Sequence, residues 1–85
     1  MRAALHKIEI GEYEFCPELD TGSGEGEEIV CWVYKGGTPL RSKADSTLQY
    51  RRYFPLNASP QHLWNFARKF AANAEYRESL LMQAI

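Results

Sequence analysis

Carboxylates crowd the segment 18–28, which reads ELDTGSGEGEE and contains almost no apolar side chain. Closely spaced carboxylates can hold a calcium ion, or can imitate the phosphates of a nucleic acid and so attract a basic protein. The segment lacks the alternating acids and the closing glutamate of an EF-hand loop, which argues against calcium. A charge run can also serve only to keep a loop solvated. We expect an acidic loop whose partner-binding residues are Glu18, Asp20, Glu25, Glu27 and Glu28.

A second candidate site lies in the stretch 34–53, where aromatic and basic side chains are interspersed. Cations hold phosphates and aromatic rings stack on bases, so this combination on neighbouring strands is typical of sheets that bind nucleic acid. The alternative is that the tyrosines belong to the core and the cations form a solvated edge. The residues of this rival site are Lys35, Arg41, Lys43, Tyr50, Arg51, Arg52 and Tyr53.

The tetrapeptide at positions 20–23 resembles the DTGS motif of aspartic proteases. Catalysis in that family needs two aspartates that share a proton, so a chain of 85 residues could act only as a dimer. The motif also needs a hydrophobic strand that leads into a buried loop, whereas charged residues surround it here. The pattern favours a turn in which Asp20 bonds to its own backbone and Gly22 adopts a positive φ.

The other residue types that could support catalysis are few and far apart. The soft metal ligands are His6, Cys16, Cys31 and His62, and no two have the short spacing of a zinc knuckle. The glycines of the acidic segment precede no helix and no nearby lysine, so they do not form a phosphate cradle. We therefore expect a non-enzymatic domain with no catalytic residue, no metal and no cofactor.

Charge is sorted along the chain, although the formal net charge is only −1. Residues 1–30 contain eight acidic and two basic side chains, and residues 31–85 contain three acidic and eight basic ones. If folding keeps these groups apart, one surface attracts basic partners and another attracts phosphates. The leading hypothesis is a protein-binding module, an inhibitor or adaptor that engages a basic, nucleic-acid-associated protein. The rival hypothesis is a nucleic-acid-binding module that uses the basic and aromatic strands.

Length and composition predict one soluble domain. A chain of 85 residues is too short for a second core, and 45% hydrophobic residues suffice for one. The sequence has neither the roughly 20 consecutive apolar residues of a membrane helix nor the pattern of a signal peptide. We therefore expect a cytoplasmic protein without membrane contact, with both cysteines reduced. A disulfide between Cys16 and Cys31 is the open alternative.

The first apolar residues change phase across Gly11-Glu12. A strand with a bulge at Gly11, or a hairpin with Gly11-Glu12 as its loop, would place Ile8, Ile10, Tyr13 and Phe15 on one face. A hairpin would set Glu9 opposite Glu14. Because like charges that face each other across strands are destabilising, we favour the bulged strand.

Two more strands are expected before the C-terminal third. Residues 28–35 (EIVCWVYK) are rich in β-branched and aromatic side chains, and apolar residues on both faces indicate a central strand. Gly36-Gly37 predicts a tight hairpin turn, and Pro39 confines the short returning segment to an edge. Residues 47–54 (TLQYRRYF) complete the sheet.

A helix is predicted to start at Ser59-Pro60, because serine caps helices and proline suits the first helical position. Asn73 followed by Glu75 resembles a second cap, so we expect a break there. The sequence thus predicts a single α+β domain over residues 1–85. A three- or four-stranded antiparallel sheet in residues 1–54 carries the acidic loop 18–28, and a C-terminal helix in residues 59–84, broken near Asn73, packs on one face.

The expected core consists of Ile8, Ile10, Tyr13, Phe15, Ile29, Cys31, Val33, Leu48, Leu63, Phe66, Phe70 and Leu80. Trp32 and Trp64 leave two alternatives open. Either they complete this core or, if both are exposed, they form an aromatic patch for a partner.

Overall fold

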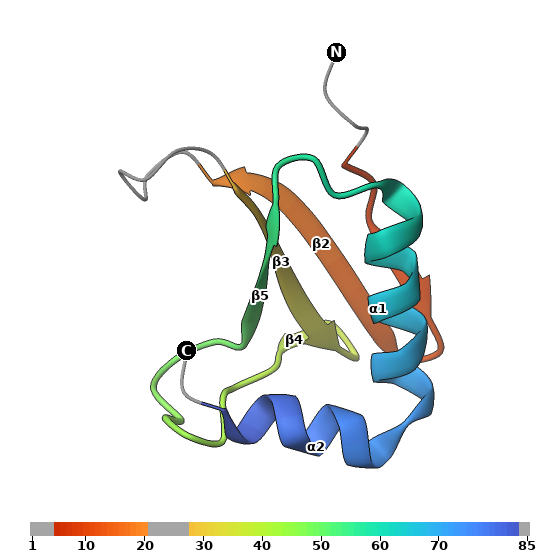
Figure 1. Ribbon diagram of the computed structural model, residues 1–85. Helices are drawn as coiled ribbons and strands as arrows, with labels where there is room; N and C mark the ends of the chain where they lie inside the picture. Colours follow the sequence, from red (N-terminus) through yellow and green to blue (C-terminus); the bar gives the residue numbers. More distant parts are fainter. Residues whose placement is uncertain (1–4, 21–27, 84–85) are drawn as a thin grey trace.

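The computed structural model describes residues 5–20 and 28–83, and it shows a sheet with two helices packed on one face (Figure 1). Its strands are β1 (Ile8–Ile10), β2 (Tyr13–Asp20), β3 (Glu28–Lys35), β4 (Thr38–Pro39) and β5 (Arg51–Pro55). Its helices are α1 (Pro60–Ala72) and α2 (Ala74–Met82). All strand pairs are antiparallel, in the order β1-β2-β3, and both β4 and β5 pair with the other edge of β3. The α+β fold predicted from the sequence is confirmed.

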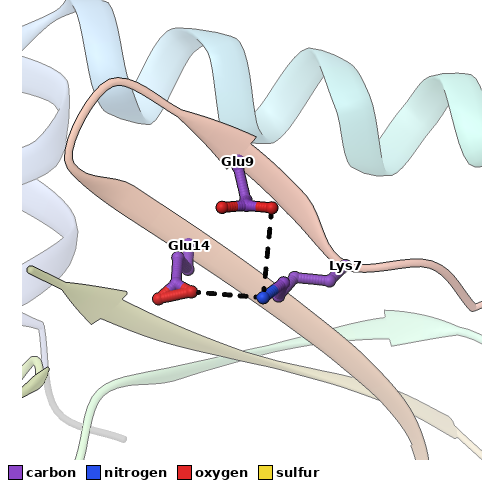
Figure 2. A network of polar contacts seen from close by, with 3 residues as sticks. All are labelled: Lys7, Glu9 and Glu14. Atoms are coloured by element: carbon purple, nitrogen blue, oxygen red, sulfur yellow. Dashed lines mark hydrogen bonds and ion pairs between the residues drawn. The ribbon is translucent and has the colours of Figure 1, made fainter. Parts of the chain in front are cut away.

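The first strand region is a hairpin of β1 and β2, so the favoured bulged strand is wrong. Gly11 has a φ of 61°, the positive value that the first loop residue of such a hairpin requires. Glu9 does lie opposite Glu14. Figure 2 shows why this pair is tolerated: the Nζ of Lys7 lies 3.4 Å from Oε2 of Glu14 and 4.0 Å from Oε2 of Glu9. The cation offsets the repulsion that argued against the hairpin.

β2 and β3 pair over eight residues each, from Tyr13 opposite Lys35 to Asp20 opposite Glu28. Residues 18–20 therefore belong to β2, and the expected loop 18–28 is wrong over these residues. The strand predicted over residues 28–35 is confirmed with the bounds of β3. Pro17 can lie within β2 because β1 pairs only with residues 13–15, which leaves an open edge beside the proline. Glu25 and Glu27 lie outside the described residues.

The turn between β3 and β4 is the expected one, with φ values of 58° at Gly36 and 83° at Gly37. Pro39 lies in the two-residue β4 at the sheet edge, also as expected.

The last strand is shorter than residues 47–54, because the chain first makes a turn. Oγ of Ser42 accepts hydrogen bonds from the N–H groups of Ala44 and Asp45, and the Asp45 carboxylate accepts from Thr47. Regular pairing of β5 with β3 begins only at Arg51.

Both predicted helix starts are confirmed. Oγ of Ser59 accepts from the N–H of His62 at 3.2 Å, and Pro60 is the first residue of α1. Asn73 ends α1 and caps α2, with its Oδ1 accepting from the N–H of Tyr76 at 3.0 Å.

Polar contacts fix α2 at both of its ends. Nη1 of Arg77 donates to two carbonyls at the end of α1, at 2.9 and 3.3 Å. Near the other end, the N–H of Lys43 donates to the carbonyl of Leu81 at 2.7 Å, and its ammonium group pairs with Glu78. The last helix is thus tied both to α1 and to the segment between β4 and β5.

An aromatic cluster joins α1 to the sheet. The ring of Phe70 is fully buried, and its centroid lies 5.7 Å from those of Tyr13, Phe15, Tyr50 and Phe66. Such aromatic pairs stabilise a core beyond the effect of the area they bury. The cluster therefore determines which face of the sheet the helix covers.

Most of the expected core residues are buried, and Ile8, Ile10 and Leu48 are half-buried. Ile8 and Ile10 remain partly exposed because β1 is an edge strand. The buried residues that are absent from the predicted core are Pro17, Val30, Ser42, Tyr50, Phe54, Ala58, Ala67 and Leu81.

Replacing Phe70 with alanine should lower the free energy of unfolding by about 3–5 kcal/mol, because the substitution removes a fully buried ring and leaves a cavity. Urea denaturation followed by circular dichroism measures this loss. Trp64→Ala is the matched control on the same helix, since Trp64 is 40% exposed and should cost much less. Equal losses in the two variants would contradict the central role of Phe70.

Candidate partner-binding surface on the sheet

One face of the sheet is turned away from the helices. Because side chains alternate along a strand, every second residue of each strand points to this face. Phe15, Val33 and Phe54 point into the core, so their neighbours along the strands point the other way. We call this surface the outer face. Its strand residues are Glu9, Glu14, Cys16, Glu18, Asp20, Glu28, Val30, Trp32, Tyr34, Pro39, Arg51, Tyr53 and Pro55.

Five outward residues are acidic, and we call them the acidic row: Glu9, Glu14, Glu18, Asp20 and Glu28. They occupy β1, β2 and the start of β3. Three basic side chains of the described residues lie on the same face. They are Lys7 beside β1, Arg51 on β5, and Arg41, whose backbone forms an isolated β-bridge with Gln49. The β1–β2 side of the outer face is therefore strongly negative, and it attracts cationic groups.

Trp32 lies at the centre of the outer face, between an acid and a base. Its Nε1–H donates to Oε1 of Glu18 at 2.8 Å, and the guanidinium carbon of Arg51 lies 4.9 Å from the centroid of its ring system. The indole is half-buried. An aromatic ring held in this way offers a rigid apolar contact next to the carboxylates, a combination suited to protein recognition.

Trp64 does not join Trp32. It lies on α1, on the helical side of the sheet, so the two tryptophans form no common patch.

The residues of the rival site are divided among different surfaces. Arg41, Arg51 and Tyr53 belong to the outer face, whereas Lys35, Tyr50 and Arg52 point to the helical side. Lys43 pairs with Glu78 on α2. The nucleic-acid hypothesis stays a prediction, but it has no single surface formed by all seven residues.

Two members of the rival site are committed to other contacts. Tyr50 is only 4% exposed, and burial raises the pKa of its phenol to about 12, although the nearby Arg52 opposes that shift. Lys35 lies 3.4 Å from Glu12. Stacking on a base would require Tyr50 to leave the core.

Opposite charges lie on the two sides of the sheet. α1 contains no acidic residue and exposes Arg68 and Lys69, while the acidic row lies on the outer face. The separation expected from the sequence is thus present in part, since Glu75 and Glu78 on α2 and the arginines of the outer face interrupt it.

The thiols are free and disfavour ionisation. Burial raises the pKa of Cys31 to about 12, and burial together with the charge of Glu14 raises the pKa of Cys16. A reactive cysteine needs a lowered pKa, so the environment does not activate either group.

In residues 5–20 and 28–83, no three potential ligands from His, Cys, Asp and Glu gather into a metal-binding group. A pocket of about 240 Å³ lies between β1, β2 and the start of α1, with His6 as its titratable lining residue. Asp20 of the protease-like tetrapeptide ends β2, and positions 21–23 lie outside the described residues.

Comparison with known protein families, curated proteins and solved structures gave no match. Neither helix of the described chain is long and apolar enough to cross a membrane. The inference about function therefore depends on the surface described above.

Glu18, Asp20 and Glu28 were predicted as binding-site residues from the sequence. The predicted site did not include Glu9, Glu14, Lys7 or the position of Trp32. The signal for Glu14 was the alternation of residues 13–20 (YEFCPELD), in which every second side chain is polar or small. If residues 13–20 are taken as one strand that continues through Pro17, this alternation places the acids of β2 on a common face.

Lys7→Ala should reduce the free energy of unfolding at low salt, since Glu9 and Glu14 would then face each other without a cation. The hydrogen bond to Glu14 and the charges of both glutamates raise the pKa of Lys7 above its ordinary value of 10.5. Its contribution should therefore persist below pH 10.5 and disappear as the pH rises through the raised value.

Urea denaturation of Lys7→Ala, Glu14→Gln and the double variant measures this coupling. The loss of unfolding free energy in Lys7→Ala should be smaller at high salt, because salt screens exposed charges. Arg68→Ala, on the surface of α1, is the control. If Lys7→Ala lowers the free energy of unfolding equally in the Glu14→Gln background and in the native background, Lys7 does not act through Glu14.

Native Cys31 should resist alkylation by iodoacetamide at pH 8–9, because it is 1% exposed and its pKa is about 12. Cys16 should react slowly, and both should react readily in urea. Both cysteines lie in the tryptic peptide 8–35, so fragmentation of that peptide in the mass spectrometer measures each site separately. Rapid native labelling of Cys31 would show that the β3 core opens easily.

Proposed function

We propose that this chain is a small non-enzymatic protein-binding module that engages a basic partner through its outer face. The observation that carries this proposal is the acidic row beside the half-buried indole of Trp32. A partner of this kind would be a nucleic-acid-associated protein, whose phosphate-binding groove the carboxylates imitate, and the domain would act as its inhibitor or adaptor.

Rigid placement supports a binding role for these carboxylates. Glu18 is held by the indole N–H of Trp32, and Glu14 by the ammonium group of Lys7. Side chains that are already ordered lose less entropy when a partner binds. Residues on paired strands also keep a fixed spacing of about 7 Å between alternate positions.

The outer face also combines charge with apolar area. Tyr34 and Trp32 lie side by side with the acids of β2, and Tyr53 is 43% exposed on the next strand. Aromatic anchors next to charged groups are typical of binding surfaces, in which the anchors contribute affinity and the charges contribute association rate and specificity.

The test neutralises three acids that lie together on the outer face and keeps side-chain shape: Glu18→Gln, Asp20→Asn and Glu28→Gln. Calorimetric titration with a blocked arginine peptide of about eight residues is done at low and moderate salt. We expect a loss of affinity of roughly tenfold or more at low salt, together with a weaker salt dependence.

The matched control removes the same charge elsewhere, with Glu12→Gln, Glu75→Gln and Glu78→Gln. It should change affinity by no more than about twofold if the outer face is the binding surface. Equal losses in both triple variants would show that only net charge matters, and the proposal would be abandoned. Glu25→Gln and Glu27→Gln extend the series to the acids outside the described residues.

A further inference from the structure

Among the described residues, the outer edge of β5 has backbone groups that pair with no other strand. The N–H of Leu40 donates to the carbonyl of Val33 at 3.0 Å, so odd-numbered residues of β3 direct their backbone groups toward β4 and β5. Their partners in β5 are Arg52 and Phe54. These two residues therefore bond to β3, and the alternate residues of β5 face away from the sheet.

The outward backbone groups belong to Arg51 and Tyr53. The carbonyl of Pro55 is already engaged, since it accepts from the N–H of Ala58 at 2.9 Å. No other strand in residues 5–20 and 28–83 pairs with this edge, and Figure 1 shows β5 at the margin of the sheet. A free edge of this kind is a template for an added strand.

The two arginines of β5 are held in place by aromatic contacts, and neither has an acidic partner among residues 5–20 and 28–83. The Arg51 guanidinium lies over Trp32, and that of Arg52 lies 5.3 Å from the ring centroid of Phe66. Nε of each is buried without a hydrogen-bond partner, and no carboxylate of the described chain forms an ion pair with either. Guanidinium groups bind carboxylates with strong, charge-assisted hydrogen bonds.

We propose that the β5 edge binds an extended acidic segment of another protein as an additional antiparallel strand. Side chains of such a strand would lie beside Phe54, Tyr53, Arg52 and Arg51 in turn. The matching segment therefore carries two apolar residues followed by two acidic ones. Tyr53 and the neighbouring Leu56, 43% and 42% exposed, supply apolar contact.

A second copy of this chain fits the edge less well. Antiparallel pairing with Tyr53 opposite its own counterpart would set Arg52 opposite Phe54 and Arg51 opposite Pro55, so neither guanidinium group would directly face a carboxylate across the new strand pair. Shifting the register to place Arg52 opposite its counterpart would bring like charges together, which is destabilising. Charge complementarity thus favours an acidic segment. This site shares Arg51 and Tyr53 with the outer face, but it lies on another strand than the acidic row and carries the opposite charge, so the two proposals are tested with different peptides.

The experiment measures amide hydrogen exchange by NMR, with and without a blocked peptide of about eight residues whose centre reads Val-Ile-Glu-Glu. We expect the amides of Arg51 and Tyr53 to exchange at least about tenfold more slowly in the complex. The amides of Arg52 and Phe54, already paired with β3, should change little. A peptide with Lys-Lys in place of Glu-Glu should give no protection.

Two variants separate the backbone contribution from the charge contribution. Tyr53→Pro removes an outward N–H, which edge positions tolerate, and should abolish peptide binding. Arg51→Gln should weaken binding roughly tenfold while leaving the backbone intact, whereas the exposed Arg68→Gln on α1 should have no effect. Circular dichroism verifies that each variant is folded.

Three results would overturn the inference. Equal binding of the acidic and basic peptides would show that charge plays no part, and unchanged exchange at Arg51 and Tyr53 would show that no strand is added. Protection that rises with the concentration of the protein alone would assign the edge to a second copy instead. These three results concern only the β5 edge, whereas the arginine-peptide titration tests the acidic row.

Discussion

The packing of Phe70 among four aromatic rings is the contact on which the rest of the arrangement depends. It seats α1 on one face of the sheet and thereby makes that face the inside. Because strand side chains alternate, every neighbour of an inward residue must then point outward. The composition of the outer face is thus a consequence of the core: Phe15 points inward, so Glu14 and Cys16 point outward.

Alternation also explains how the charges are distributed. The adjacent Arg51 and Arg52 are sent to opposite faces, where each lies over a different aromatic ring. The acids of β2 are two or four residues apart, so they share a face. A sequence can therefore contain a compact basic run and yet display it on two surfaces. The same rule gathers more widely spaced acids into one row.

Local signals were sufficient to predict the helices. Ser59, Pro60 and Asn73 act through contacts within one helical turn, so their effect can be read from neighbouring residues. The strands were harder, because pairing depends on partners far along the chain. The hairpin at Gly11 was rejected for a repulsion that Lys7 relieves, and Pro17 hid the continuation of β2.

The candidate site was predicted only in part, because it too depends on pairing between strands that are far apart in the sequence. Glu18, Asp20 and Glu28 could be selected as acids, but their position on a strand pair required the register of β2 with β3. The position of Trp32 also depended on that register, since Glu18 and Arg51 come from different strands. Residue type indicated the chemistry of the surface, and long-range pairing determined its members.

The attachment of α2 to the segment between β4 and β5 constrains the order of assembly during protein synthesis. The carbonyl of Leu81 accepts from the backbone of Lys43, so that segment obtains this partner only after the final helix has been made. A nascent chain emerging from a ribosome could form the β1–β2 hairpin early, but not the closed domain. Until both helices have been made, apolar side chains such as Tyr50, which stacks on Phe70 of α1, lack their helical cover, and exposed apolar surface of this kind favours aggregation.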